Sequence, residues 1–405
     1  MTNSTFDEAT NAEIARRLFA HVEAATTDYA DGVMRYDASV YTDPALMVRE
    51  RERIFRRDPI MVCHGSELAK PRDFLNMRMP NGYVLVVRQE DGSVKSFLNS
   101  CRHRGNVLTT EACGNQRVFS CQYHGWCYNT DGGLRSLSEE HTFGEVDKSE
   151  LGLIELPTEE RHGFVWVVLD PQAEIHVAES LGEEFDAVLG RYPLETYTCY
   201  RSQAFDQPVN WKVLLDAFLD NYHLRYTHAQ SVGPYFYSNL MLSRPYGRHN
   251  QIIATKKSID KVREEDPELV SIERYVTVAQ FVWPNAQLMR QPDAHFTLFT
   301  FIPDPIDVAR SRMEIRILIP EPANTPELVA LWDKNWDILM KTIVDEDLQM
   351  CRDLQLAMSS EGLQPLYLGK NEVVNQMFHR EHARLMGAAE DGAVIRPNGS
   401  TNGPS

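Results

Sequence analysis

The spacing of apolar residues at the start of the chain is helical. Ile14, Leu18, Phe19 and Val22 fall on one face of a 3.6-residue period. We therefore expect an amphipathic helix from about Phe6 to Ala25.

Between about Asp58 and Asp170 the apolar positions alternate or form short β-branched runs, which predicts a β-rich section. Turn signals such as Pro80-Asn81-Gly82 and Glu90-Asp91-Gly92 separate these runs. The expected strands are Ile60–Val62, Phe74–Met77, Tyr83–Val87, Val94–Phe97 and the buried run Gly163–Leu169.

After this section helical and strand periods follow one another. We expect helices over Val177–Leu189, Asn210–Arg225 and Val373–Met386, and strands over Tyr197–Phe205 and within residues 272–319. Thr325 and Pro326 predict the start of a long helix, whose buried stripe is Leu328, Trp332, Trp336, Met340 and Ile343.

These patterns together predict an α+β protein. The expected parts are an N-terminal helical segment over residues 1–40, a β-rich domain over 41–175, a sheet-and-helix domain over 176–387 and a flexible tail over 388–405. The tail is rich in Gly, Pro, Asn and Ser.

Charge and cysteine content narrow the class of protein. The formal net charge of −17 disfavours binding to nucleic acid or to an anionic membrane surface. No apolar run reaches the roughly 20 residues that span a bilayer, and the polar N-terminus does not resemble a secretory signal. Seven cysteines are too few for a disulfide scaffold, so we expect a cytoplasmic protein with reduced thiols or metal ligands.

Two segments of the β-rich section each combine one cysteine with one histidine. They are Cys101-Arg102-His103 and Cys121-Gln122-Tyr123-His124, and both follow expected strands. A zinc finger usually groups cysteines together and histidines together, whereas a Rieske [2Fe–2S] cluster has two thiolates on one iron and two imidazoles on the other. The mixed pairs favour Cys101, His103, Cys121 and His124 as cluster ligands.

The flanking residues agree with a cluster. Gly105 and Gly125 allow each loop to turn backbone N–H groups towards sulfur, and Trp126 and Tyr128 can exclude water. A structural zinc site, or ordinary buried cysteines and histidines, remain the alternatives. The other five cysteines, Cys63, Cys113, Cys127, Cys199 and Cys351, are interpreted as small hydrophobic residues.

A second group of metal-ligand residues follows Asn210. On an ideal helix Asp216, Asp220 and His223 share one face with Val213, but His228 lies five residues beyond His223 and points elsewhere. The helix must loosen or end there if both imidazoles are to reach one ion, and π-type bulges are frequent at such sites.

The long late helix supplies a carboxylate. Asp347 continues the stripe that passes through Met340 and Ile343, and a buried carboxylate is costly unless it is paired or binds a metal. Two histidines and one carboxylate form the facial triad of non-haem Fe(II) oxygenases, which favours His223, His228 and Asp347. Asp345 and Glu346 are rivals, and core histidines or a solvent-facing acid remain alternatives.

These segments resemble those of one known family. Cys101–Gly105 with Cys121–Trp126 is similar to the Rieske motif of aromatic-ring-hydroxylating oxygenase α subunits, and Asn210–His228 is similar to their mononuclear-iron motif. The other similar segments are Glu346-Asp347 with Gln355, which resembles the third-ligand helix, and Leu368-Gly369 with Phe378-His379, which resembles the closing helix. The resemblance extends from about residue 40 to residue 386.

The resemblance implies a Rieske domain followed by a helix-grip, START-like catalytic domain with a central antiparallel sheet and long C-terminal helices. It also implies a homotrimer, with or without a β subunit, in which Asp220 links His223 of one chain to His124 of the next. The family commonly has Glu-Asn where this chain has Asp216-Ala217, so the surroundings of the iron differ.

The expected function is that of a terminal oxygenase, which uses O₂ to mono- or cis-dihydroxylate a small aromatic substrate. No Gly-x-Gly-x-x-Gly motif is present, so NAD(P)H would act only through a separate reductase, with or without a ferredoxin. The alternative is a Rieske monooxygenase that removes O- or N-alkyl groups from a methoxy-aromatic or quaternary ammonium compound. A Rieske electron carrier without enzymatic activity, or a zinc-stabilised lipid-binding or interaction protein, would not need the second iron site.

Overall fold

The chain divides into two compact units. The computed structural model describes residues 6–291, 294–360, 362–363, 365–387, 390–391 and 394–395. One unit, here called the β unit, comprises residues 51–180 and 193–198, and the other, the sheet–helix unit, comprises residues 1–50, 181–192 and 199–405. The described N-terminal residues up to Glu50 group with the sheet–helix unit.

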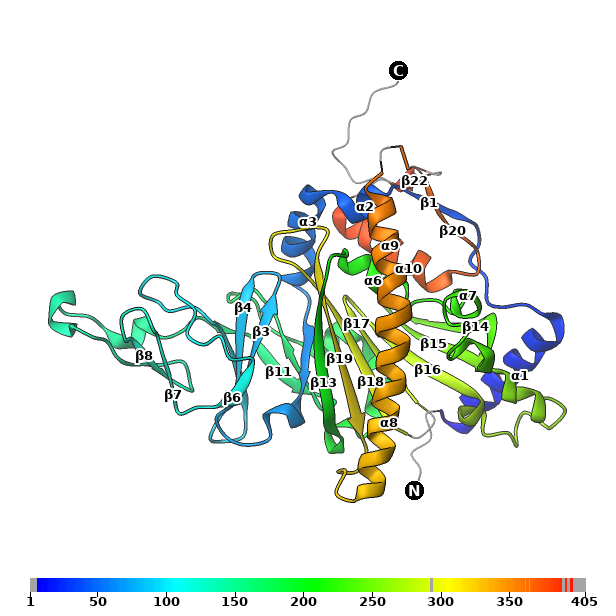
Figure 1. Ribbon diagram of the computed structural model, residues 1–405, viewed down its shortest axis with the longest axis horizontal. Helices are drawn as coiled ribbons and strands as arrows, with labels where there is room; N and C mark the ends of the chain where they lie inside the picture. The colour runs from blue at the N-terminus through cyan, green and yellow to red at the C-terminus, as the bar shows by residue number, and fades with distance from the viewer. Residues whose placement is uncertain are drawn as a thin grey trace. The chain divides into compact units, whose positions relative to one another are not determined.

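The β unit contains three antiparallel sheets (Figure 1). The five-stranded sheet has the order β10 (Glu155–Leu156), β5 (Val94–Leu98), β4 (Gly82–Arg88), β3 (Asp73–Met79), β6 (Cys113–Asn115). The two three-stranded sheets are β11 (Thr158–Arg161), β12 (Phe164–Val167), β2 (Ile60–His64) and β7 (Val118–Ser120), β8 (Cys127–Asn129), β9 (Leu134–Ser136). The five expected strands of this section are thus confirmed.

The core of the β unit reaches into the cysteine-bearing loops. Phe74, Leu85 and Phe97 from the five-stranded sheet share one buried cluster with Cys101 and Cys121. The two thiols therefore sit at the edge of an apolar core, where water is excluded.

The sheet–helix unit is organised around a seven-stranded sheet. Its order is β13 (Thr198–Gln207), β19 (Ser311–Ile319), β18 (Phe296–Pro303), β17 (Ala286–Arg290), β16 (Val276–Val282), β15 (His249–Lys256), β14 (Phe236–Tyr246). The pairs from β19 to β14 are antiparallel, so alternate residues of each strand face opposite sides of the sheet.

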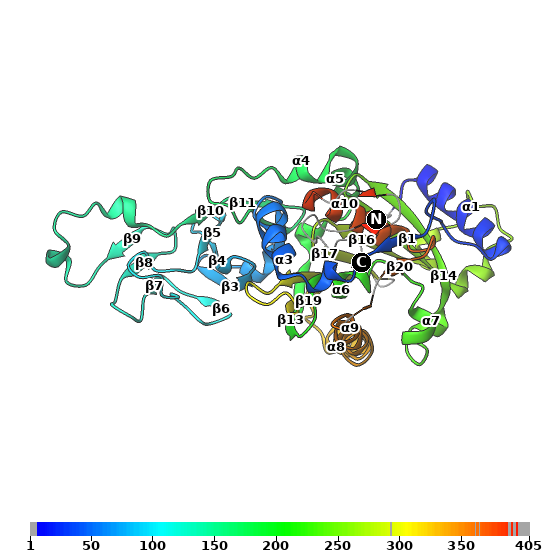
Figure 2. The ribbon, with the colours of Figure 1, turned by 90° about the horizontal axis from the view of Figure 1, so that it is seen from above.

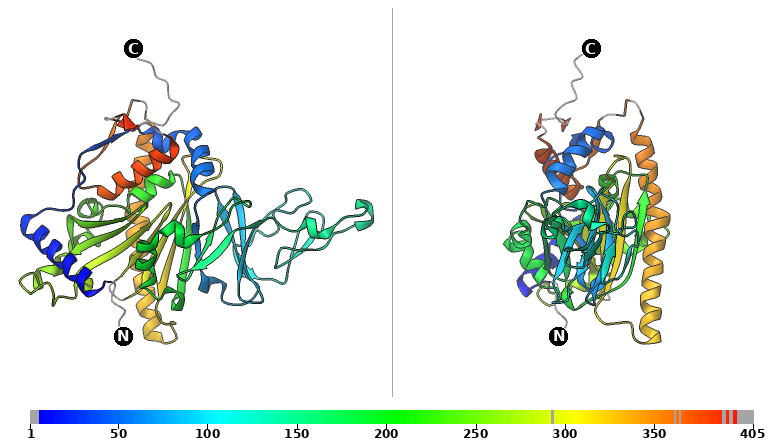
Figure 3. Two further views of the ribbon diagram at one scale, coloured as in Figure 1. Left: turned by 180° about the vertical axis from the view of Figure 1, so that it is seen from behind. Right: turned by 90° about the vertical axis from the view of Figure 1, so that its left-hand side faces the viewer.

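Helices cover both faces of this sheet (Figure 2). On one side lie α8 (Pro326–Thr342) and α9 (Leu348–Met358), joined by a π-helical turn over Ile343–Asp347. On the other lie α5 (Glu183–Gly190) and α10 (Val373–Met386), as the two views of Figure 3 also show. The expected start of the long helix is confirmed, because the Thr325 hydroxyl accepts a hydrogen bond from the Leu328 N–H at 3.3 Å.

The N-terminal helix packs on the outer part of the sheet. Helix α1 (Glu8–Ala24) buries Ile14 and Leu18 in one cluster with Leu242 and Ile253, which confirms the predicted apolar face. The remaining elements of this unit are α2 (Ser39–Thr42), α3 (Pro44–Glu50), α6 (Trp211–Asp216), α7 (Leu224–Thr227), β1 (Met34–Tyr36), β20 (Leu366–Leu368), β21 (Glu390–Asp391) and β22 (Val394–Ile395).

Three expectations about elements were wrong or fall partly outside the described residues. The expected helix over Val177–Leu189 is two helices, α4 (Val177–Leu181) and α5, because Gly182 between them has a positive φ of 74°. The expected helix over Asn210–Arg225 ends at Asp216. The expected flexible tail lies mostly outside the described residues, which include the short strands β21 and β22.

Candidate metal centres and substrate cavity

The two cysteine–histidine loops of the β unit have the same backbone geometry. In the first, Cys101 N donates to Asn106 O at 2.8 Å and Gly105 N donates to Cys101 O at 2.8 Å. In the second, Cys121 N donates to Trp126 O at 2.8 Å and Gly125 N donates to Cys121 O at 2.9 Å. Both glycines have φ above 70°, a conformation that residues with a side chain rarely adopt.

These loops bring all four predicted ligands together. The rings of His103 and His124 have centroids 4.6 Å apart, and both thiols are buried. Burial alone would raise the pKa of Cys121, but hydrogen bonds from the backbone N–H groups of Tyr123 and His124 outweigh it and lower that pKa. N–H groups directed at sulfur are the environment that a cluster requires.

Aromatic side chains cover the same loops. Trp126 stacks on His103 with an interplanar angle of 8°, and the Tyr128 hydroxyl lies 3.4 Å from the sulfur of Cys101. Trp126 and Tyr128, which the sequence suggested as a cover against water, therefore contact one histidine and one cysteine of the candidate ligand set.

The donor set fits a binuclear cluster better than a single zinc ion. Nδ1 of His124 is buried and has no hydrogen-bond partner, so it is available as a ligand atom. In the described residues only His223, His228 and Asp347 place three ligand atoms within 4.8 Å of one another. The cysteine–histidine loops do not do so, whereas the donors around one tetrahedral zinc must lie that close.

The second candidate centre forms where α6 ends. The chain leaves the helix at Asp216 and forms one further turn, α7, between His223 and His228. This break solves the geometric problem that five-residue spacing poses for a regular helix, and the two imidazole centroids lie 5.2 Å apart. The π-helical turn occurs instead on the opposite helix, at Ile343–Asp347.

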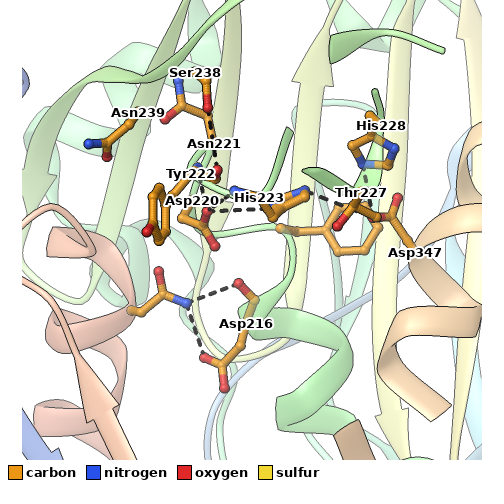
Figure 4. A network of polar contacts seen from close by, with 12 residues as sticks. Asp216, Asp220, Asn221, Tyr222, His223, Thr227, His228, Ser238, Asn239 and Asp347 are labelled. Carbon is orange, nitrogen blue, oxygen red and sulfur yellow. Dashed lines mark hydrogen bonds and ion pairs between the residues drawn. The ribbon is translucent and has the colours of Figure 1, made fainter. Parts of the chain in front are cut away.

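Asp347 faces both imidazoles (Figure 4). Its Oδ1 lies 3.0 Å from Nε2 of His228 and 3.9 Å from Nε2 of His223. That oxygen is buried, yet its contact with His228 lacks the geometry of a hydrogen bond. Two imidazoles and a buried carboxylate oxygen converging in this way fit the facial triad of an Fe(II) ion.

The Nδ1 atom of each histidine contacts a carboxylate. Nδ1 of His223 lies 3.2 Å from Oδ1 of Asp220, and Nδ1 of His228 lies 2.5 Å from Oε2 of Glu346. These contacts leave both Nε2 atoms directed towards Asp347. The sequence pointed to Asp220 through a resemblance, but it presented Glu346 only as a rival of Asp347, whereas the structure gives it this separate contact.

The acids also change the protonation of the imidazoles. Burial alone would lower the pKa of His223, but the charge of Asp220 outweighs it and raises that pKa. The pKa of His228 is likewise raised against the effect of burial, chiefly through Asp347. A metal ion would replace these protons, because metal ligation requires neutral imidazole.

Asp216 does not join this group, so the expectation of a common face with Asp220 and His223 was wrong. Its carboxylate accepts a hydrogen bond from the Tyr41 hydroxyl at 2.6 Å and lies 3.0 Å from Nε2 of His379. The change of direction after α6 turns it away from the triad. The neighbouring Ala217 does line the cavity described below.

A buried ionic cluster anchors the start of α6. The ammonium of Lys212 lies 2.5 Å from the carboxylate of Glu50, which also contacts Nε2 of His382 at 2.7 Å and accepts from Trp211 Nε1 at 3.0 Å. All four side chains are almost completely buried. We call this group the Glu50 cluster, and no pattern in the sequence indicated it.

A cavity of about 360 Å³ opens onto the triad. Phe218 and Leu224 line it from the iron-site segment, and residues of β15 to β18 and α8 form the other walls, as expected for residues 276–300. Among the described residues that line it, Asp220 and Asp347 are the only Asp, Glu, Lys or Arg side chains. Apart from these two acids, the described lining is therefore neutral and mainly apolar.

Both units match known protein families. Residues 58–148 match the Rieske [2Fe-2S] domain, and residues 194–388 match the catalytic domain of the ring hydroxylating alpha subunit. The first match contains the four predicted cysteine and histidine ligands, and the second contains the candidate iron ligands His223, His228 and Asp347. In the described residues no helix is long and apolar enough to cross a membrane.

Several characterised oxygenase subunits are similar in sequence. The large subunit of anthranilate 1,2-dioxygenase from Acinetobacter baylyi is 34% identical over 49% of this chain and 43% of its own length. The alpha subunit of biphenyl 2,3-dioxygenase from Rhodococcus jostii is 36% identical over 47% of this chain and 42% of its own. These matches thus span less than half of those relatives. The carnitine monooxygenase oxygenase subunit of Acinetobacter pittii is 24% identical over 82% of this chain and 86% of its own.

Solved structures show the same fold. A quaternary ammonium Rieske monooxygenase with bound L-carnitine superposes with a TM-score of 0.72 at 20% identity, over 88% of this chain and 96% of the other. Naphthalene 1,2-dioxygenase with bound phenanthrene gives 0.71 at 21% identity, over 87% and 92%. With both domains matched in order and a triad beside a cavity, the chain belongs to the Rieske non-haem iron ring-hydroxylating oxygenases, as an alpha subunit.

Proposed function

We propose that this chain is the terminal oxygenase of a ring-hydroxylating system that acts on a neutral aromatic substrate. The observation that carries the proposal is the neutral, mainly apolar cavity that opens directly onto His223, His228 and Asp347. When bound, the [2Fe–2S] cluster supplies electrons one at a time and the Fe(II) ion activates O₂ beside the substrate.

The residues have separate roles in this proposal. Cys101, His103, Cys121 and His124 hold the cluster, and His223, His228 and Asp347 hold the iron, which leaves positions open for O₂ and substrate. Asp220 and Glu346 fix the imidazole orientations. Apolar walls such as Phe218 and Phe299, whose centroids are 4.7 Å apart, exclude water from the reacting centre.

The proposal includes a homotrimer in which Asp220 of one chain contacts His124 of the next. Exposed tyrosines adjoin both residues: Tyr222 is 46% exposed beside Asp220, and Tyr123 is 55% exposed beside His124. Exposed aromatic residues are enriched at protein interfaces. A separate reductase, with or without a ferredoxin, supplies the electrons, and the low content of seven cysteines in 405 residues agrees with a cytoplasmic location.

Dealkylation is the second candidate, because the match to the carnitine monooxygenase subunit extends over most of both chains. A carboxylate on a quaternary ammonium substrate would need a cationic partner, and the described residues that line the cavity include no Lys or Arg side chain. This difference favours a neutral aromatic substrate.

Turnover in ¹⁸O₂ with a generic reductase separates the two reactions. Two labelled atoms in one product from an aromatic hydrocarbon indicate dioxygenation, and one indicates monooxygenation. Release of formaldehyde from a methoxy-aromatic or quaternary ammonium compound, with no ring hydroxylation of hydrocarbons, would overturn the proposal in favour of dealkylation.

The ligand assignment has its own test. Asp347→Ala should lose mononuclear iron and turnover while the absorption of the reduced and oxidised cluster is unchanged. Asp345→Ala, two residues away, is the matched control and should retain both metals. Equal iron loss in the two variants would contradict the triad.

A further inference from the structure

We propose that the cavity selects a neutral substrate of two linked or fused aromatic rings, with a hydrogen-bonding group on the ring remote from the iron. This inference rests on the proposed function, because it takes the triad as the reacting end. It concerns the opposite end of the cavity, which no metal ligand touches.

Helix α8 and the turn after it line the cavity along its whole length. Asp347, Ile343, Leu339 and Asn335 all contribute to the lining, and their spacing of four residues places them on one helical face. With about 1.5 Å of rise per residue, Asn335 lies roughly 18 Å from Asp347 along the helix axis. The cavity therefore extends from the triad for several helical turns.

The sheet lines the opposite wall in the same direction. Gln287 and Met289 pair with Phe299 and Thr297 on the neighbouring strand, and all four line the cavity. Gln287 belongs to the iron end, because its Nε2 donates to the backbone carbonyl of Phe218 at 2.7 Å. Gln291 lies four residues further, or about 13 Å along an extended chain.

Polar groups meet at the end remote from the iron. Gln291 N donates to His295 O at 2.9 Å, and the ring of His295 lies 5.3 Å from that of Trp332, one turn before Asn335. The side chains of Gln291, His295 and Asn335 all line the cavity. We call these three residues the distal cluster.

The chemistry of the distal cluster suits a hydroxyl, ether or carbonyl group. Asn335 Nδ2 donates to Leu331 O at 3.0 Å. The side-chain carbonyl oxygen of Asn335 can therefore accept a hydrogen bond from a ligand. Amide and imidazole groups bind neutral polar atoms, and the described residues that line this end of the cavity include no carboxylate, ammonium or guanidinium to bind an ion.

Length and polarity together define the substrate. A single ring placed at the triad cannot reach a cluster more than ten ångströms away, whereas two rings can. A site that hydrogen-bonds a substrate hydroxyl discriminates against the analogue that lacks it, because that hydrogen bond is then lost.

The test compares biphenyl with 4-hydroxybiphenyl as substrates of the holoenzyme. The wild type should show a higher kcat/KM for the hydroxylated compound, with oxygen inserted in the unsubstituted ring. Asn335→Leu and Gln291→Leu should each lower kcat/KM for 4-hydroxybiphenyl by about tenfold, the effect of one hydrogen bond, and leave biphenyl within about twofold. Gln349→Leu is the matched control, since it removes an exposed amide that contacts Asp353 on α9.

Binding of both compounds is measured in parallel by quenching of tryptophan fluorescence. If neither compound is oxygenated but 4-hydroxybiphenyl still binds about tenfold more tightly than biphenyl, and Asn335→Leu abolishes that preference, the proposed function fails and the distal cluster stands. If both compounds are oxygenated with no preference, or if the two variants lower both substrates equally, the inference is overturned while the proposed function stands.

Discussion

Removal of the carboxylate charge from the Glu50 cluster should destabilise the sheet–helix unit strongly. In Glu50→Gln the new amide can still accept from Trp211, but the ammonium of Lys212 loses the counter-ion that lies 2.5 Å away. Lys212 is completely buried, so water cannot replace that charge. Breaking a buried ion pair by removing one partner costs about 3–5 kcal/mol.

The pKa of Glu50 indicates a contribution of the same direction and order of magnitude. Burial would raise its pKa, but Lys212 and His382 outweigh burial and lower it from 4.5 to about 2. A shift of that size corresponds to about 3 kcal/mol at 1.36 kcal/mol per pKa unit. Because the folded-state pKa is the lower one, this stabilisation is present above pH 4.5 and is lost as the pH falls towards 2.

The measurement is urea unfolding followed by tryptophan fluorescence and circular dichroism. Glu50→Gln should lower the free energy of unfolding at pH 7 by about 3 kcal/mol or more. The loss should shrink as the pH rises, because burial lowers the pKa of Lys212 and favours its neutral form. Glu268→Gln is the control: this carboxylate is 59% exposed and pairs with Arg16, so its loss should cost under about 1 kcal/mol.

A double variant completes the design. Glu50→Leu combined with Lys212→Met removes both charges and should recover most of the stability, because apolar side chains of similar volume replace a buried pair at little cost. If Glu50→Gln costs no more than Glu268→Gln, or if the double variant is the least stable of the set, the reasoning is refuted.

The remaining predictions concern the iron site and two backbone positions. Glu346→Gln should weaken iron binding by about 10- to 100-fold, since its carboxylate orients His228; an unchanged Kd from iron titration would contradict this. Burial, together with the nearby charges of Asp220 and Asp216, raises the pKa of Glu372 to about 7. The wild type should therefore lose stability as the pH rises from 4.5 to 7, by up to about 3 kcal/mol, while Glu372→Gln should not. Urea unfolding at pH 5 and pH 8 measures this difference. Gly163→Ala should destabilise the β unit by about 2–3 kcal/mol, because φ is +78° and a Cβ would lie 2.7 Å from backbone atoms. Gly92→Ala, with φ of +89° in open space, should cost about half as much when both glycine variants are compared by urea unfolding.

Much of the fold follows from local patterns. The strands from Ile60 to Leu98 and the helix from Pro326 are correct in the sequence interpretation, because each is a short run with clear turn or cap residues at its ends. The helix expected over Asn210–Arg225 is wrong beyond Asp216. The side-chain amides of Asn375 and Gln287 donate to the backbone carbonyls of Asp216 and Phe218. Further on, Asp220 accepts hydrogen bonds from the N–H groups of Tyr222 and His223. Side chains thus compete for the backbone groups that a longer helix would use, and periodicity does not detect this.

The part of the candidate site that could be predicted consists of residues whose pattern is visible within a short stretch of sequence. The mixed cysteine–histidine pairs and the apolar stripe that ends at Asp347 are visible in the sequence. The contacts of Glu346 with His228 and of Glu50 with Lys212 join residues more than a hundred positions apart. Exposed acids of the same type are common, so nothing in the local pattern distinguishes these two from the other acidic residues.

The π-helical turn at Ile343–Asp347 makes the iron site sensitive to insertions and deletions in one helix. Such a turn contains one residue more than an α-helical turn, and each residue of an α-helix rotates the chain by about 100°. Deletion of a single residue there would leave the apolar character of the helix almost unchanged. It would nevertheless turn the buried side chains of Cys351 and Gln355 away from their present contacts. When distant relatives are aligned, a gap placed inside this helix would therefore assign the third iron ligand to the wrong acid.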